Sequence, residues 1–166
     1  MVVISNIIWI DPNADNEENR GYLKDLQSYN YFKVKSFKNI DEAIDVIKKI
    51  EFEETYIILN GRLYIKFIEK FKDNLKDIYI IPKIIIFTGN KEKFIEYNKE
   101  YINILNHPFY NLGGIKTFYD EIKTFILNPI NKTILKRDDE GQLSSFSSIC
   151  WFFLFNNFFL FFIFVI

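Results

Sequence analysis

Four polar residues that directly follow apolar runs are the candidates for chemistry in this sequence. Asp11 follows Asn6–Ile10, Asn60 follows Thr55–Leu59, Thr88 follows Lys83–Phe87, and His107 follows Ile102–Asn106. A carboxylate can bind a cation, a hydroxyl can hydrogen-bond a phosphoryl group, and an imidazole can act as a base. If the runs are parallel strands, their carboxyl ends meet at one edge of a sheet, so these side chains are expected to share a site.

The elements that would position these residues alternate between strands and helices. The expected strands are the four runs above and Tyr31–Phe37, in which apolar and polar residues alternate as in a strand near a sheet edge. Between and after them, apolar residues at helical spacing predict helices over 17–29, about 40–50, 64–76, 92–101 and 115–127. This alternation predicts an α/β fold, a doubly wound five-stranded parallel sheet with helices on both faces.

The ends and inner faces of these helices are also predicted. Asp15 is the expected N-cap of the first helix, and Asn39 or Asp41 that of the second. The side chains expected to face inward from the last helix are Phe118, Ile122, Phe125 and Ile126.

Composition argues against several classes of protein. Lys and Arg total 21 and Asp and Glu total 22, so we expect no broad basic face for a nucleic acid. A single Cys and a single His allow no internal disulfide and no zinc cluster. The apolar run near Met1 is too short for a secretory signal, so a cytosolic N-terminal domain is expected.

The strand ends resemble those of the response-regulator receiver domain over roughly Asn6 to Leu127. In that family an acidic pair ends the first strand, a phosphoacceptor aspartate the third, Ser or Thr the fourth, and Lys before a proline the fifth. Here Asp11 is the single acid, Asn60 stands at the acceptor position, and Thr88 fits the pattern. Pro108 is retained, but His107 stands in place of the lysine.

The resemblance implies a degenerate receiver, or pseudo-receiver, with no catalytic residue, no metal and no cofactor. An amide is a poor nucleophile and brings no charge to a cation, and Asp11 alone is too few carboxylates for magnesium. Related modules act through protein contacts. The aromatic residues Tyr101, Phe109 and Tyr110 flank the expected fifth strand and are the candidate partner surface.

Each candidate also has a purely structural interpretation. A carboxylate before proline forms turns, a hydroxyl at a strand end caps the next turn, and a lone histidine often serves as a hydrogen-bonding group. The Gly113-Gly114 pair lacks the longer spacing of a phosphate-binding loop and favours a flexible loop.

The composition changes after residue 128. Residues 129–148 are expected to be a polar linker, and residues 149–166, rich in Phe, a hydrophobic C-terminal helix long enough to anchor the chain in a membrane by a single pass. The N-terminal domain, residues 1–128, would then face the cytosol. The open alternative is that this tail is translated non-coding sequence, in which case a cytoplasmic protein is expected.

We therefore predict a non-catalytic, receiver-like interaction or signalling module rather than an enzyme. One alternative is a small-ligand sensor or enzyme that uses the pocket around Asp11, Asn60, Thr88 and His107. Another is a truncated or misannotated fragment of a larger signalling protein. The sequence identifies no particular protein partner.

Overall fold

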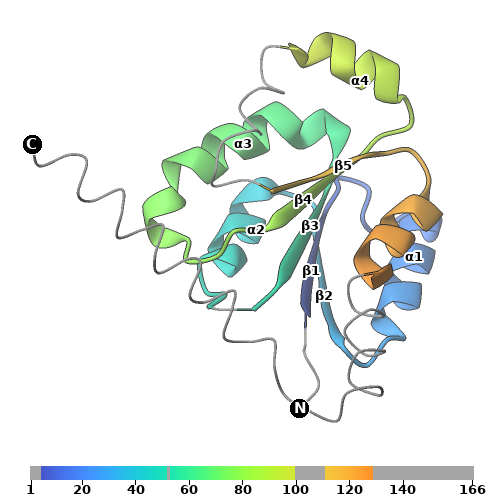
Figure 1. Cartoon of the computed structure of the whole chain (residues 1–166), viewed down its shortest axis with the longest axis horizontal. Helices are drawn as coiled ribbons and strands as arrows, with labels where there is room; N and C mark the ends of the chain where they lie inside the picture. Colours follow the sequence, from blue (N-terminus) through green and yellow to red (C-terminus); the bar gives the residue numbers. More distant parts are fainter. Residues whose placement is uncertain (1–4, 52, 100–110, 129–166) are drawn as a thin grey trace, which may run out of the picture. The chain divides into compact units, whose positions relative to one another are not determined.

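The computed structural model describes residues 5–51, 53–99 and 111–128, which form a parallel sheet with helices packed on it (Figure 1). The strands are β1 (Ser5–Ile10), β2 (Phe32–Phe37), β3 (Thr55–Asn60), β4 (Lys83–Phe87) and β5 (Asn111–Lys116). The helices are α1 (Glu17–Gln27), α2 (Ile40–Ile47), α3 (Tyr64–Asp73), α4 (Lys91–Tyr97) and a last helix over 119–128, with 3-10 turns η1 (Gly61–Leu63) and η2 (Leu75–Asp77). One compact unit ends at Ile126, within this last helix.

The sheet has the order β2-β1-β3-β4-β5, and all neighbouring strands are parallel. The predicted five-stranded parallel α/β fold is confirmed. The chain first steps from β1 to β2 on one side and then returns to β3 on the other, so the strand order reverses between β1 and β3. In open α/β sheets, ligands bind outside the carboxyl ends of the strands at such a reversal. Asp11 and Asn60 lie there.

Alternate residues of the strands face two separate layers of the core. One layer joins the sheet to α2, α3 and α4 and includes Ile8, Ile57, Leu59, Tyr64, Phe67 and Phe94. On the other face, Trp9 contacts Tyr22 of α1, and Tyr56 contacts Phe125 of the last helix. Figure 1 shows α2 and α3 on one side of the sheet and α1 with the orange helix 119–128 on the other. The sheet is therefore covered on both faces.

Asparagine side chains cap the starts of α1, α2 and α4. Asn16 Oδ1 accepts from the Asn19 backbone N–H at 2.7 Å, so Asn16 is the N-cap of α1 and the expectation of Asp15 is wrong. The Asp15 carboxylate instead pairs with Lys38 Nζ at 2.7 Å. Of the two residues expected to cap α2, Asn39 does so, accepting from Glu42 N at 3.0 Å.

The fifth strand of the described sheet is Asn111–Lys116, whereas Ile102–Asn106, where this strand was predicted, lies outside the described residues. Two glycines lower the strand propensity of the true segment, but the structure requires both. A Cβ on Gly113 would lie 2.8 Å from Ile85 Cγ1, and Gly114 has φ of 97°. Gly113 is the extra residue of a bulge opposite Ile84 and Ile85, so the pair expected in a loop belongs to the sheet.

The last helix begins at residue 119 and not at 115 as expected, because β5 continues to Lys116. Glu121 Oε2 accepts from the backbone N–H groups of Thr117 and Phe118, which caps the helix start. Phe118 is 71% exposed, so its expected inward position is wrong, whereas Ile122 and Ile126 are fully buried as predicted.

None of the helices within the described ranges combines the length and apolar character that a bilayer crossing requires. The segment 149–166, from which the membrane anchor was predicted, lies outside the described residues.

Candidate functional site

Asp11 and Asn60 meet at the carboxyl edge of the sheet. Asn60 Nδ2 donates to Asp11 Oδ2 at 2.8 Å, and the Asn13 backbone N–H donates to Asp11 Oδ1 at 2.7 Å. On the far side of the amide, Asn60 Oδ1 accepts from the Arg62 backbone N–H at 3.0 Å. Both oxygens of the carboxylate and both ends of the amide therefore have partners within the chain.

Burial makes these hydrogen bonds important to the site. Asp11 is 4% exposed, and a buried carboxylate must be compensated by donors or by a cation. Here two N–H groups compensate it, one of them from Asn60. The Asn60 amide thus gives Asp11 the local compensation that a cation could otherwise give, without adding a charge.

Thr88 lies beside the turn that follows Asn60. A Cβ built on Gly61 would come within 3.0 Å of Thr88 Cβ and 3.2 Å of Phe94 Cδ2, so the β3–η1 turn approaches Thr88 closely because residue 61 has no side chain. The Thr88 hydroxyl accepts from the Asn90 backbone N–H at 3.5 Å, a long contact. Of the four residues predicted to share a site, the structure brings Asp11 and Asn60 into contact and places Thr88 against the same turn.

Lys116 occupies the end of the fifth strand, the position predicted for His107. It pairs in register with Phe87, and its carbonyl accepts from Thr88 N at 3.0 Å. Its ammonium group lies 5.7 Å from the centroid of the Phe125 ring, turned back along β5 toward Gly114. The described strand β5 therefore ends at Lys116, whereas His107, which was expected at the end of the fifth strand, lies outside the described residues.

Five of the predicted residues belong to the segment 100–110. His107 and Pro108, together with the candidate partner residues Tyr101, Phe109 and Tyr110, lie outside the described residues. Within the described ranges, no three His, Cys, Asp or Glu side chains gather closely enough to hold a metal ion.

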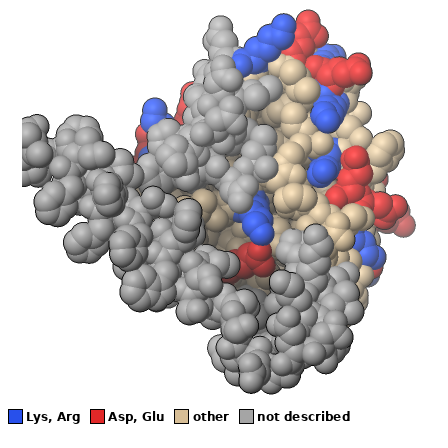
Figure 2. Space-filling view, in the orientation of Figure 1, with Lys and Arg blue, Asp and Glu red and all other residues tan. Residues whose placement is uncertain are grey.

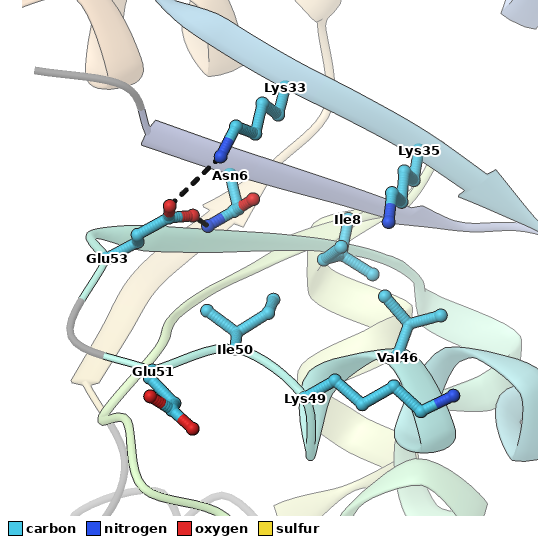
Figure 3. A pocket seen from close by; sticks show the side chains of 9 residues that line it. All are labelled: Asn6, Ile8, Lys33, Lys35, Val46, Lys49, Ile50, Glu51 and Glu53. Atoms are coloured by element: carbon cyan, nitrogen blue, oxygen red, sulfur yellow. Dashed lines mark hydrogen bonds and ion pairs between the residues drawn. The ribbon is translucent and has the colours of Figure 1, made fainter.

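A groove of about 490 Å³ lies at the opposite end of the sheet, near the starts of the strands. Its lining residues are Asn6, Ile8, Lys33, Lys35, Val46, Lys49, Ile50, Glu51 and Glu53. Figure 3 shows Glu53 reaching Asn6 and Lys33, at 2.5 and 3.0 Å, while Lys35 and Lys49 lie to either side of Val46. Hydrogen bonds from Asn6 and then Lys33 lower the pKa of Glu53. This groove contains none of the strand-end candidates.

Charged side chains of both signs are interleaved on the described surface that Figure 2 draws. Ion pairs such as Lys33–Glu53 and Lys38–Asp15 join acidic and basic side chains that are 20 and 23 residues apart in the sequence. The view therefore gives no single-sign field that would attract a polyanion.

Comparison with known proteins finds similarity to solved structures. No protein-family model matches the chain, and a search of curated proteins finds no match. Among solved structures, the chain is similar to one described as the crystal structure of adenylate cyclase from Rhodopirellula baltica. The two are 19% identical with a TM-score of 0.47, over 81% of this chain and 98% of the other. A likeness at this identity says nothing of activity.

Proposed function

We propose that the α/β domain is a pseudo-receiver, a protein-interaction module that accepts no phosphoryl group. The observation that carries the proposal is the hydrogen bond from Asn60 Nδ2 to Asp11 Oδ2 at 2.8 Å. It joins the two strand ends at which a receiver would hold its metal and its phosphoacceptor. At the acceptor position this chain has an amide nitrogen that donates a hydrogen bond, whereas a receiver needs a carboxylate oxygen.

The chemistry of this pair opposes phosphoryl transfer in two ways. The amide of Asn60 is a weak nucleophile, and its oxygen already accepts from Arg62 N. A magnesium ion prefers several oxygen ligands with at least one or two carboxylates, and Asp11 would have to exchange hydrogen bonds from Asn13 and Asn60 for it. A cation would therefore bind at the expense of the existing site.

Exposed aromatic side chains support an interaction role. Tyr97, the last residue of α4, is 71% exposed, and Phe118, between β5 and the last helix, is 71% exposed. Large aromatic residues at a surface are favoured contact points for protein partners. They precede and follow in sequence the segment that contains Tyr101, Phe109 and Tyr110, which we propose as part of the same partner surface.

Phosphorylation with radiolabelled acetyl phosphate and Mg²⁺ tests the proposal directly. The full chain, checked by mass spectrometry for an intact Asn60, is compared with Asn60→Asp and with Asp11→Ala. We expect no acid-labile, hydroxylamine-sensitive label on the wild-type chain. A stoichiometric acyl phosphate on the wild-type chain would overturn the proposal, whereas label on Asn60→Asp alone would agree with it.

Calorimetry provides a second readout that does not depend on phosphoryl transfer. Mg²⁺ titrated into the wild-type chain is expected to give no saturable heat at millimolar concentrations, because Asp11 already has two donors. Tight Mg²⁺ binding that Asp11→Asn abolishes would contradict this part of the proposal.

A further inference from the structure

Asn60 is followed by Gly61, the only Asn-Gly dipeptide among the 166 residues. An asparagine before glycine is chemically labile because no side chain shields the following backbone nitrogen from the asparagine side chain. Gly61 has packing reasons to lack a side chain, since a Cβ would meet Thr88 and Phe94. Asn60, at the centre of the proposed site, is therefore also the asparagine whose sequence context most favours loss of the side-chain amide.

We propose that Asn60 is a deamidation site, and that its hydrogen bond to Asp11 controls how fast the amide is lost. The inference rests on the proposed function, because it describes how that same site would change with time. Deamidation would replace a hydrogen-bond donor beside Asp11 by a second carboxylate.

The reaction consumes one water and releases one ammonia. The backbone nitrogen of Gly61 attacks Asn60 Cγ, the bond from Cγ to the side-chain nitrogen breaks, and ammonia leaves with the proton lost by the Gly61 nitrogen. Water then opens the resulting succinimide at one of its two carbonyl groups. The product at position 60 is aspartate or isoaspartate, and no oxidant or reductant is needed.

The native geometry holds the amide away from this reaction. Asn60 has an extended backbone with ψ of 128°, and the Asn60–Gly61 peptide must rotate before the ring can close. The side chain is held at both ends, by Asp11 Oδ2 through its nitrogen and by Arg62 N through its oxygen. Cyclisation requires both contacts to open, so the fold slows a reaction that the unfolded chain would undergo readily.

The product would have a different electrostatic character. Two carboxylates at the distance of the present hydrogen bond repel each other, which favours either a shared proton or a bound cation. Deamidation of Asn60 would thus replace the hydrogen-bonded Asn60–Asp11 pair by two neighbouring carboxyl groups.

Peptide mapping by mass spectrometry tests the control of the rate. The full-length wild type, Asp11→Asn and the control Asp15→Asn are incubated at mildly alkaline pH, and a mass increase of one dalton is followed at residue 60. Asp11→Asn leaves one carbonyl oxygen for two donors, so we expect conversion to be faster by about tenfold, the factor for one charge-assisted hydrogen bond. In the wild type the Asp15 carboxylate pairs with Lys38 and not with Asn60, so Asn60 of the Asp15→Asn variant should convert at the wild-type rate.

A second measurement keeps the inference testable if Asp11→Asn does not fold. Wild-type chain is incubated with and without a denaturing concentration of urea, and conversion in the native state should be at least about tenfold slower, by the same reasoning on lost hydrogen bonds. Equal rates in the two states would overturn the inference. So would equal rates in wild type and folded Asp11→Asn, or no conversion at residue 60 in any sample.

The consequence for the site is measured with Mg²⁺ as the probe. Asn60→Asp and the converted wild-type chain should both bind Mg²⁺ more tightly than the freshly purified wild type, and equal binding by all three would refute this step. The two proposals fail separately. A phosphoryl label on fresh, intact wild type would end the pseudo-receiver proposal, while a stable Asn60 would end only this inference.

Discussion

Tyr119 stacks on Tyr22, with ring centroids 4.2 Å apart and ring planes within 9° of parallel. The Tyr119 hydroxyl donates to Asp25 Oδ2 at 2.6 Å, and Lys123 Nζ lies 2.8 Å from the same oxygen. Burial, and then the hydrogen bond to Asp25, raise the pKa of Tyr119 well above its ordinary value. One carboxylate of α1 therefore holds two residues of the last helix, which fixes that helix beside α1 on one face of the sheet.

Replacing Asp25 by Asn should loosen this contact. Hydrogen bonds from Lys123 and then Tyr119 lower the pKa of Asp25 below its ordinary value of 3.8. A carboxyl with a lowered folded-state pKa contributes stability above 3.8 and loses it as the pH falls through the folded-state value. We expect Asp25→Asn to cost about 1 kcal/mol at pH 7, since the pair is partly exposed, and the difference from wild type to shrink below pH 3.8.

Urea denaturation at several pH values measures this difference. The control is Asp45→Asn, which removes an exposed carboxylate from α2 and should change the free energy of unfolding by less than about 0.5 kcal/mol. A difference between Asp25→Asn and wild type that stays constant from pH 7 to acid would contradict the assigned role of the carboxylate.

The three glycines 21, 113 and 114 should respond in opposite directions to alanine. A Cβ on Gly113 would lie 2.8 Å from Ile85 Cγ1 and 2.9 Å from Phe125 Cε1, and Gly114 has φ of 97°. Gly21 lies in α1 with nothing within 4 Å of its Cβ position. We expect Gly113→Ala and Gly114→Ala each to destabilise by about 1–3 kcal/mol, and Gly21→Ala to stabilise by about 0.5–1 kcal/mol.

Thermal unfolding of the three variants distinguishes these effects. The Gly21 variant is the matched control, because it makes the same chemical change on an open helix surface. If Gly113→Ala were as stable as wild type, the close approach between β5, β4 and the last helix would be wrong.

The sequence predicted those elements whose local pattern and tertiary role agree. β4 has the predicted bounds, because Ile84, Ile85 and Ile86 form an apolar run that is buried on both faces. β5 was missed for the opposite reason. Gly113 is required by the bulge and by close packing, and Gly114 by its positive φ. Strand propensity reveals neither requirement, because glycine is unfavourable within strands. The more regular run at Ile102–Asn106 was therefore chosen instead.

The same error concealed the residue that ends β5. Lys116 could not be identified as a strand end once Ile115 had been assigned to the last helix. A usable signal existed in Thr117–Glu121, where the acid caps the backbone of Thr117 and Phe118 and so places the helix start after Lys116. The hydrogen bond between Asp11 and Asn60 could not be derived from spacing, because it depends on which strands are neighbours.

Membrane anchoring by residues 149–166 remains a prediction from the sequence alone. If the segment inserts, the full chain should stay with cell membranes after carbonate extraction. Phe158→Lys combined with Phe159→Lys should release it, because each charge near mid-span costs about 2.5–3.5 kcal/mol on an insertion scale. Ser145→Lys, which lies before the apolar segment, is the control and should remain bound. Extraction of the wild-type chain by carbonate would contradict the prediction.

The final prediction concerns the polar network at the end of the sheet opposite Asp11. Glu54 Oε1 accepts from Lys83 Nζ at 2.6 Å and from the Tyr56 hydroxyl at 2.9 Å, and Glu54 Oε2 accepts from Ser5 Oγ at 3.1 Å. Burial acts to raise the pKa of Glu54, but the hydrogen bond and charge of Lys83, with Tyr56 and Ser5, lower it overall. Burial, with Glu54 nearby, raises the pKa of Tyr56, which keeps the phenol a donor.

Because this network is partly buried, Lys83→Met should destabilise the wild type by about 2 kcal/mol but the Glu54→Gln background by less than about 1 kcal/mol. The adjacent pair Lys33–Glu53 has side chains 50% and 41% exposed, and Lys33→Met should cost less than about 0.5 kcal/mol.

The stabilisation by Glu54 should also depend on pH. Since the pKa of Glu54 is lowered from 4.5, its contribution to the free energy of unfolding should persist above that pH and disappear as the pH falls below it. A double-mutant cycle measured by urea denaturation at pH 7 and in acid checks both claims, and additive effects at pH 7 would mean that Glu54 and Lys83 do not stabilise each other.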